Sequence, residues 1–155
     1  MKIFRAFWFL SFLAAFANLM YVYASLSETV IVQQEGVSPV VLSRDSVFYI
    51  SLAFLAVVNV LVYVVGRVYT RNEPLRSWFH GLVVTLNIFF IMALSYISLF
   101  NSGERFAFDR AGAIVLGSVL LFITWTVAWP VYLISESFQL NNQFDPVVRW
   151  LLKIR

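Results

Sequence analysis

The chain has 155 residues, of which 61% are hydrophobic and only 12% are charged. A soluble domain is nearer to half apolar and a quarter charged, and a chain of this length has too little interior to hide so much apolar surface from water. The absence of cysteine excludes disulfides and thiol chemistry, and the formal charge of +3 is spread between apolar runs rather than gathered in a stripe that would bind nucleic acid. We therefore expect an integral membrane protein.

Four apolar stretches are long enough to cross a membrane, since a spanning helix needs about 20 residues. They cover residues 4–26, 46–66, 77–99 and 111–134. Each stretch must be helical, because lipid offers no hydrogen-bond partner to an open backbone. The first is too long for the core of a signal peptide, so we expect it to remain as a span. The predicted fold is an all-α membrane protein, with a single four-transmembrane-helix bundle over residues 1–155.

The connection after the first stretch predicts a short extracytoplasmic β-hairpin. Two runs rich in β-branched residues, 29–32 and 40–42, flank a Gln-Glu-Gly sequence. In the second outer connection, the side chains of residues 105–108 alternate in a pattern typical of a strand. This segment would add a third strand to a small sheet; irregular loops are the alternative. A sheet of this kind keeps an open edge, onto which a partner strand can pair. The residues expected to meet such a partner are Val30, Ile31, Val32, Val41, Phe106 and Phe108.

The connection between the second and third stretches contains Asn72-Glu73-Pro74, a turn signal that makes these two helices antiparallel neighbours. Eight of the 11 basic residues lie before the first span, in this connection or after the last span. They are Lys2, Arg5, Arg67, Arg71, Arg76, Arg149, Lys153 and Arg155. By the positive-inside rule, both termini are expected in the cytoplasm, and the expected location is a bacterial inner membrane.

The C-terminal tail, residues 141–155, is predicted to lie on the cytoplasmic membrane surface as an amphipathic turn. Asp145 followed by Pro146 is a favourable helix start, and Trp150 lies between Arg149 and Lys153.

The two halves of the chain, residues 1–70 and 71–140, resemble each other. An Arg followed closely by a Trp opens the first span (Arg5, Trp8) and the third span (Arg76, Trp78). Duplication of a helix–strand–helix hairpin would explain the likeness. The alternative is that membrane interfaces require Arg and Trp at these places.

The polar residues deep in the predicted spans are not ionisable. Asn18, Asn59 and Asn87 carry amides, which commonly hydrogen-bond between helices at about 0.6–2 kcal/mol each. We predict a helix-packing role for them, with a solute pathway as the alternative. The single histidine, His80, lies near the end of the third span, where a hydrogen-bonding role is expected rather than haem ligation or proton transfer. No catalytic, cofactor-binding or metal-ligating set is predicted.

Small residues four apart, such as Ala113 and Gly117, allow another helix to approach closely. Over residues 21–67, the order of helix, short outer strands and helix resembles small bacterial membrane proteins of unknown function that carry a β-rich linker after the first span. No residue role is carried over from this likeness.

The sequence predicts a non-catalytic protein, a structural or accessory subunit of a larger membrane complex. It would contact membrane lipids and other membrane-protein subunits, or copies of itself, through its spans and outer loops. A small homo-oligomeric transporter, channel or lipid-binding protein is the alternative. Neither a cofactor nor a nucleic-acid partner is expected.

Overall fold

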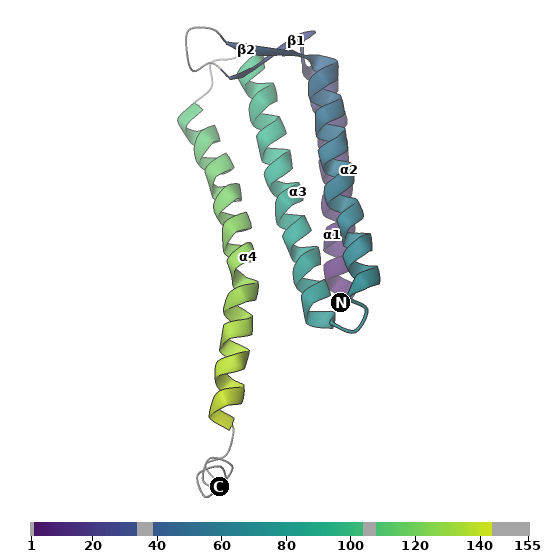
Figure 1. The fold of residues 1–155 in the computed structure, drawn as a ribbon. Helices are drawn as coiled ribbons and strands as arrows, with labels where there is room; N and C mark the ends of the chain where they lie inside the picture. The colour runs from purple at the N-terminus through teal and green to yellow at the C-terminus, as the bar shows by residue number, and fades with distance from the viewer. Residues whose placement is uncertain (1, 34–38, 104–107, 144–155) are drawn as a thin grey trace, which may run out of the picture.

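The computed structural model describes residues 2–33, 39–103 and 108–143. Four long helices lie roughly alongside one another, and a pair of short strands crosses one end of them (Figure 1). The elements in chain order are α1 (Lys2–Ser25), β1 (Thr29–Gln33), β2 (Val40–Ser43), α2 (Arg44–Val68), α3 (Glu73–Asn101) and α4 (Phe108–Gln143). We call the end with the N-terminus and the α2–α3 connection the turn end, and the opposite end the strand end.

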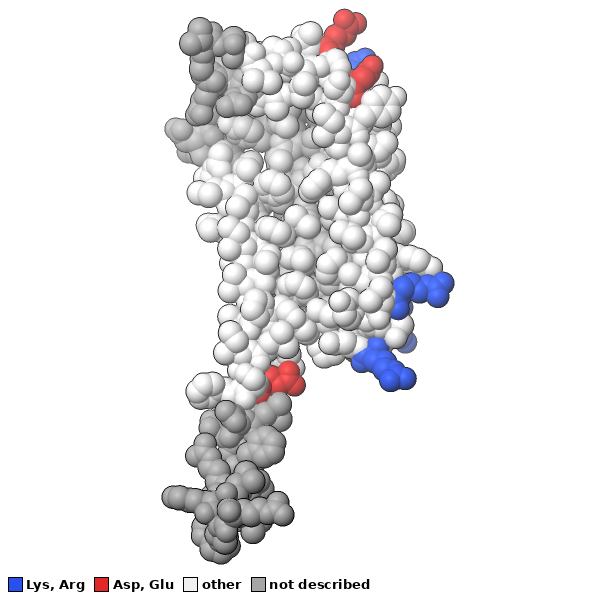
Figure 2. Space-filling model, viewed as in Figure 1, with Lys and Arg blue, Asp and Glu red and all other residues white. Residues whose placement is uncertain are grey.

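All four helices are long and apolar enough to cross a membrane, which confirms the four predicted apolar helices. On the face shown in Figure 2, the charged side chains gather towards the two ends, and a broad uncharged band separates them. A band of this kind matches the hydrocarbon layer of a bilayer, where an exposed charge is costly.

Local side-chain bonds fix where α2 and α3 begin. Ser43 caps α2, because its Oγ accepts the backbone N–H of Ser46 at 3.1 Å. Asn72 caps α3 in the same way, accepting the N–H of Leu75 at 3.0 Å, and a proline follows in the first turn. The turn signal at this connection therefore acts as predicted, and α2 and α3 run antiparallel.

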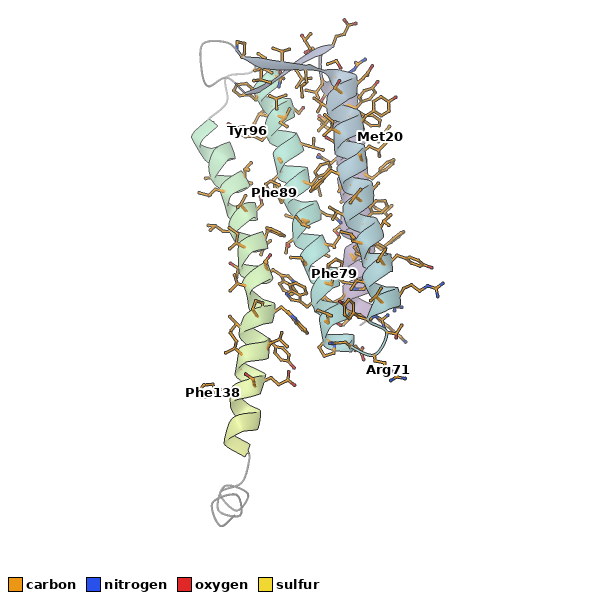
Figure 3. All side chains as sticks on the ribbon, viewed as in Figure 1. Met20, Arg71, Phe79, Phe89, Tyr96 and Phe138 are labelled. Atoms are coloured by element: carbon orange, nitrogen blue, oxygen red, sulfur yellow. The ribbon has the colours of Figure 1, made fainter. Side chains whose placement is uncertain are left out.

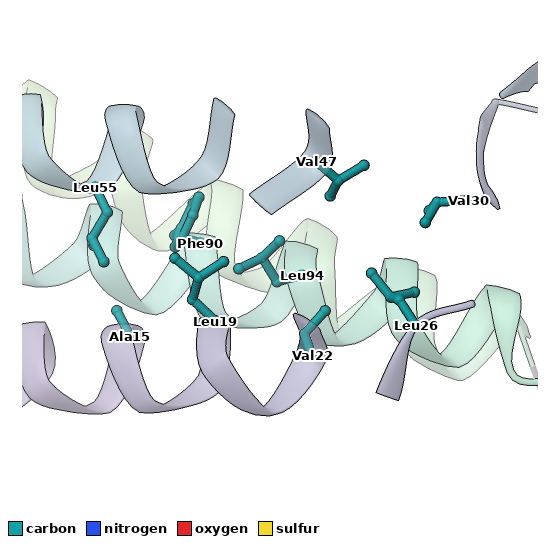
Figure 4. Close-up of a cluster of buried hydrophobic side chains, with 9 residues drawn as sticks. All are labelled: Ala15, Leu19, Val22, Leu26, Val30, Val47, Leu55, Phe90 and Leu94. Carbon is teal, nitrogen blue, oxygen red and sulfur yellow. The ribbon is translucent and has the colours of Figure 1, made fainter. Parts of the chain in front are cut away.

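Helices α1, α2 and α3 pack together as a three-helix group. The larger of its two buried apolar clusters, called the core below, lies in the half nearer the strand end, where side chains from all three helices and from β1 meet (Figure 4). The core consists of Ala15, Leu19, Val22, Leu26, Val30, Val47, Leu55, Phe90 and Leu94. Ala15 is fully buried, and its small side chain lets α1 approach closely.

Helix α4 packs mainly on α3, meets α1 through the rings of Trp125 and Phe4, and extends beyond the other helices at the turn end (Figure 1). Two reciprocal bonds join it to α3: the indole of Trp78 donates to the carbonyl of Trp125, and the indole of Trp125 donates to the carbonyl of Trp78, both at 2.9 Å. Gly81 faces the same indole, and a Cβ there would overlap the Trp125 ring. The helices thus form a three-helix group with α4 laid on α3.

The predicted hairpin is confirmed as two antiparallel strands, with Thr29 opposite Ser43 and Ile31 opposite Val41. The third strand was placed wrongly at Phe108, which is the first residue of α4; the rest of that segment, including Phe106, lies outside the described residues. The last helix also continues well past the predicted limit, to Gln143, because its backbone bonds do not depend on apolar side chains. Residues 144–155 of the predicted amphipathic tail lie outside the described residues.

Candidate functional site

Two of the three predicted amides meet at the centre of the three-helix group. Asn59 of α2 and Asn87 of α3 face each other, and each donates an amide N–H to the other's oxygen, at 3.1 and 3.2 Å. Helix α1 completes the contact. Trp8 donates its indole N–H to the oxygen of Asn59 at 2.9 Å, and Ser11 accepts an amide N–H of Asn87 at 3.0 Å.

Every side-chain donor in this amide network has an acceptor. The second N–H of Asn59 bonds the Leu55 carbonyl at 2.8 Å, and the Ser11 hydroxyl donates to the Trp8 carbonyl at 2.8 Å. Both amide side chains are buried, with Asn59 7% and Asn87 1% exposed. A fully satisfied network in an apolar surrounding is rigid, and it retains no unused N–H for a passing solute.

The third amide, Asn18, lies nearer the strand end and has separate partners. It donates to the carbonyl of Ile91 at 3.3 Å, and its oxygen accepts the Ser95 hydroxyl at 3.2 Å. Both bonds run from α1 to α3. The structure therefore places all three amides between helices but joins only Asn59 and Asn87 to each other.

A cavity of about 270 Å³ opens at the turn end, where α1, α2 and α3 converge. We call it the turn-end pocket. One water molecule occupies only about 30 Å³ of liquid, so the pocket has room for a small molecule or part of one. Its lining residues are Arg5 and Trp8 of α1, Val62, Tyr63, Gly66 and Arg67 of α2, and Arg76 and His80 of α3.

The three arginines of the pocket come from three different helices. Arg67 lies beside Tyr63, with its Nε 3.4 Å from the phenol oxygen and its guanidinium carbon 5.8 Å from the ring centre. Arg76 donates one Nη1 hydrogen to the Thr70 carbonyl at 3.2 Å, while its buried Nε–H has no partner among the described residues. The described residues that line the pocket include these three arginines and no carboxylate.

His80 closes the inner side of the pocket and is 5% exposed. Its Nδ1 lies 2.6 Å from the carbonyl of Arg76, and a carbonyl only accepts, so Nδ1 carries the hydrogen. The ring also meets the Trp8 indole edge-on, with 5.9 Å between ring centres. Backbone and indole together fix the orientation of the imidazole, which agrees with a hydrogen-bonding histidine.

The strand end differs from the predicted partner surface in one respect. Val30 is fully buried in the core, so its side chain is unavailable to a partner, whereas Val32 and Val41 are exposed. The outer edge of β1 is also partly occupied. Asn101, the last residue of α3, accepts the N–H of Ile31 at 2.8 Å and donates to the carbonyl of Ile31 at 3.1 Å.

Sequence reasoning missed both Asn101 and the pocket arginines as site residues. The arginines were interpreted only as determinants of topology. An earlier signal existed, because Arg5 and Arg76 each precede a tryptophan at the same end of neighbouring spans. No protein-family model, no curated protein and no solved structure matches this chain.

Proposed function

We propose that this protein is a non-catalytic subunit of a larger membrane complex, and that it holds a transmembrane helix of its partner along α4. The observation that carries the proposal is the arrangement of side chains around α4. One side of this helix packs on α3, and a flank of the helix next to that side presents a row of small residues to the outside.

The two sides follow from the helical repeat of about 100° per residue. The positions that turn towards α3 are Ser118, Phe122, Trp125 and Trp129, which are buried or half-buried. The small residues Ala113, Gly117, Thr124 and Ala128 lie about 90–150° around the helix from these positions, and all four are exposed. A Cβ added at Gly117 would meet no atom within 4 Å. Lipid chains gain little packing energy from such small side chains, but a second helix can use them for close approach of its backbone.

A leucine placed in this row of small residues tests the proposal. Gly117→Leu should reduce recovery of the partner at least tenfold when the protein is extracted from its native membrane in mild detergent. Gly112→Leu is the matched control: its Cβ also meets no atom within 4 Å, but it lies about 140° away around α4. Retention of a stoichiometric partner by Gly117→Leu, or its absence from the unmodified protein, would refute the proposal.

The same extraction experiment distinguishes the alternative function from the proposed subunit role. A homo-oligomeric transporter, channel or lipid-binding protein would yield only copies of this chain, in a defined number. Loss of that self-association in Gly117→Leu would show instead that the row of small residues forms the contact between copies of this chain.

We further propose that the turn end faces the cytoplasm of a bacterial inner membrane. The support is the collection of Lys2, Arg5, Arg67, Arg71 and Arg76 at that end. Reporter fusions after residue 155 and within residues 34–38 should report opposite sides of the membrane. The same side for both fusions would contradict the orientation and the count of four spans.

A further inference from the structure

We propose that the turn-end pocket is a binding site for a phosphate group. Two sources carry this group to a membrane interface: the headgroup of an anionic phospholipid, and free phosphate in solution. The charge, the hydrogen-bond donors and the shape of the pocket each support this ligand.

The charge argument starts from Arg67 and Arg76, which come from two different helices and line one cavity. Guanidinium groups repel one another, and the repulsion grows where apolar walls lower the local dielectric. An anion placed between them reverses the sign of the interaction. Phosphate is the anion that arginine recognises best, because its planar fork of N–H donors matches the oxygen geometry.

The donor argument concerns Arg76. Its Nη1 donates to the Thr70 carbonyl, and its Nε–H is buried without a partner among the described residues. A buried donor without an acceptor is destabilising by about 1–3 kcal/mol. A small movement of the side chain towards a phosphate oxygen in the pocket would supply that acceptor.

The shape argument concerns the rest of the wall. Trp8, Val62 and Tyr63 form an apolar and aromatic side next to the arginines, so the lining is amphipathic. Gly66 widens it, since a Cβ there would meet no atom within 4 Å. A phospholipid presents the same sequence of chemistry, with a charged phosphate followed by the glycerol ester and its apolar acyl chains.

The test uses the full-length protein in a neutral detergent, with thermal unfolding followed by tryptophan fluorescence. In one arm the protein is titrated with dioleoyl phosphatidylglycerol, and in a second with dioleoyl phosphatidylcholine, which has the same chains but no net charge. A third arm uses inorganic phosphate, with sodium chloride at equal ionic strength as its control. A bound ligand raises the melting temperature in a saturable way.

Three variants locate the response. Arg76→Gln removes the central donor, and Gly66→Leu fills the pocket while keeping every charge; each should weaken the apparent affinity at least tenfold. Arg71→Gln is the matched control, because Arg71 lies close by in the α2–α3 connection (Figure 3) but does not line the pocket. It should change the affinity less than twofold. If Arg76→Gln fails to fold, Gly66→Leu decides the test alone.

Saturable stabilisation by phosphatidylglycerol that Gly66→Leu abolishes assigns the pocket to a lipid headgroup. The same pattern with inorganic phosphate, and not with the lipid, assigns it to free phosphate. The proposal is overturned if neither ligand gives a saturable shift, or if Gly66→Leu and Arg71→Gln bind as tightly as the unmodified protein.

Discussion

Replacing Asn87 by leucine tests whether the amide network stabilises the three-helix group. Asn87 is 1% exposed and makes three side-chain bonds, of which one goes to Ser11 of α1 and two go to Asn59 of α2. Leucine has the same number of side-chain heavy atoms and the same branching at Cγ, and it offers neither a donor nor an acceptor. The substitution therefore removes polar bonds to two other helices at once and leaves the apolar packing largely intact.

The expected loss can be estimated from these bonds. Hydrogen bonds between membrane helices contribute about 0.6 kcal/mol on average, so three bonds contribute about 2 kcal/mol. The substitution also leaves one N–H of Asn59 without its acceptor, which brings the expected loss to about 2–3 kcal/mol. For a chain of about this size, each kcal/mol lowers the melting temperature by roughly 2–4 °C. We expect a decrease of about 4–12 °C in detergent.

Asn18→Leu is the matched control, because it makes the same chemical change in a neighbouring place. Asn18 is half-buried and makes two longer bonds, at 3.3 and 3.2 Å. Its loss should amount to about 1 kcal/mol. Thermal unfolding of both variants in one detergent, followed by circular dichroism, gives the comparison. A decrease for Asn87→Leu no larger than that for Asn18→Leu would refute the stabilising role of the network.

The double variant Asn59→Leu with Asn87→Leu measures the pair directly. Once one amide is gone, the other has already lost its partner, so the two losses should not add. We expect the double variant to be more stable than the sum of the single variants predicts, by about 1 kcal/mol or more. Additivity within about 0.5 kcal/mol would show that the two amides do not interact.

Three further predictions concern the contacts that fix α4 and the strands. Gly81→Ala should destabilise the protein by about 1–3 kcal/mol in thermal unfolding, because its Cβ would overlap the Trp125 indole. The control Gly66→Ala adds a Cβ that meets no atom within 4 Å, so it should not destabilise the protein. Equal losses of stability in the two variants would contradict the contact between Gly81 and Trp125. Trp125→Phe keeps an aromatic ring but removes one of the two reciprocal indole hydrogen bonds, so the free energy of unfolding should decrease by about 0.5–1.5 kcal/mol. Asn101→Ala should speed hydrogen exchange at the amide of Ile31 at least tenfold, and an unchanged rate would exclude the bond between them.

The four spans could be predicted from the sequence because their signal is local and strong. In lipid, a run of roughly 20 apolar residues must form a helix to satisfy its backbone hydrogen bonds. The structure has a helix at each predicted place. Helix ends were predicted less well. The fourth span was expected to end near residue 134, but α4 continues through Glu136 to Gln143, since a helix can extend into water once it has formed.

The contacts between helices could not be predicted in the same way. That Asn59 and Asn87 are polar and deep is visible in the sequence, but their pairing depends on the rotation of two helices about their axes. The pairing of Trp78 with the carbonyl of Trp125 has no sequence signal at all, because every residue has a carbonyl. The third strand was wrong at Phe108 because an alternating pattern of four residues is too short to compete with the start of a long helix.

The bond between Ile31 and Asn101 has a consequence for the order in which the protein is assembled. The two residues are 70 positions apart in the chain. At a synthesis rate of about 5–20 residues per second, the ribosome needs roughly 4–14 s to reach Asn101 after it has made Ile31. During that interval β1 can pair with β2, but its outer edge at Ile31 stays open to any other strand. Helix α3 must be inserted along its full length before Asn101 can cover that edge, so completion of the strand end depends on the third span reaching its final depth.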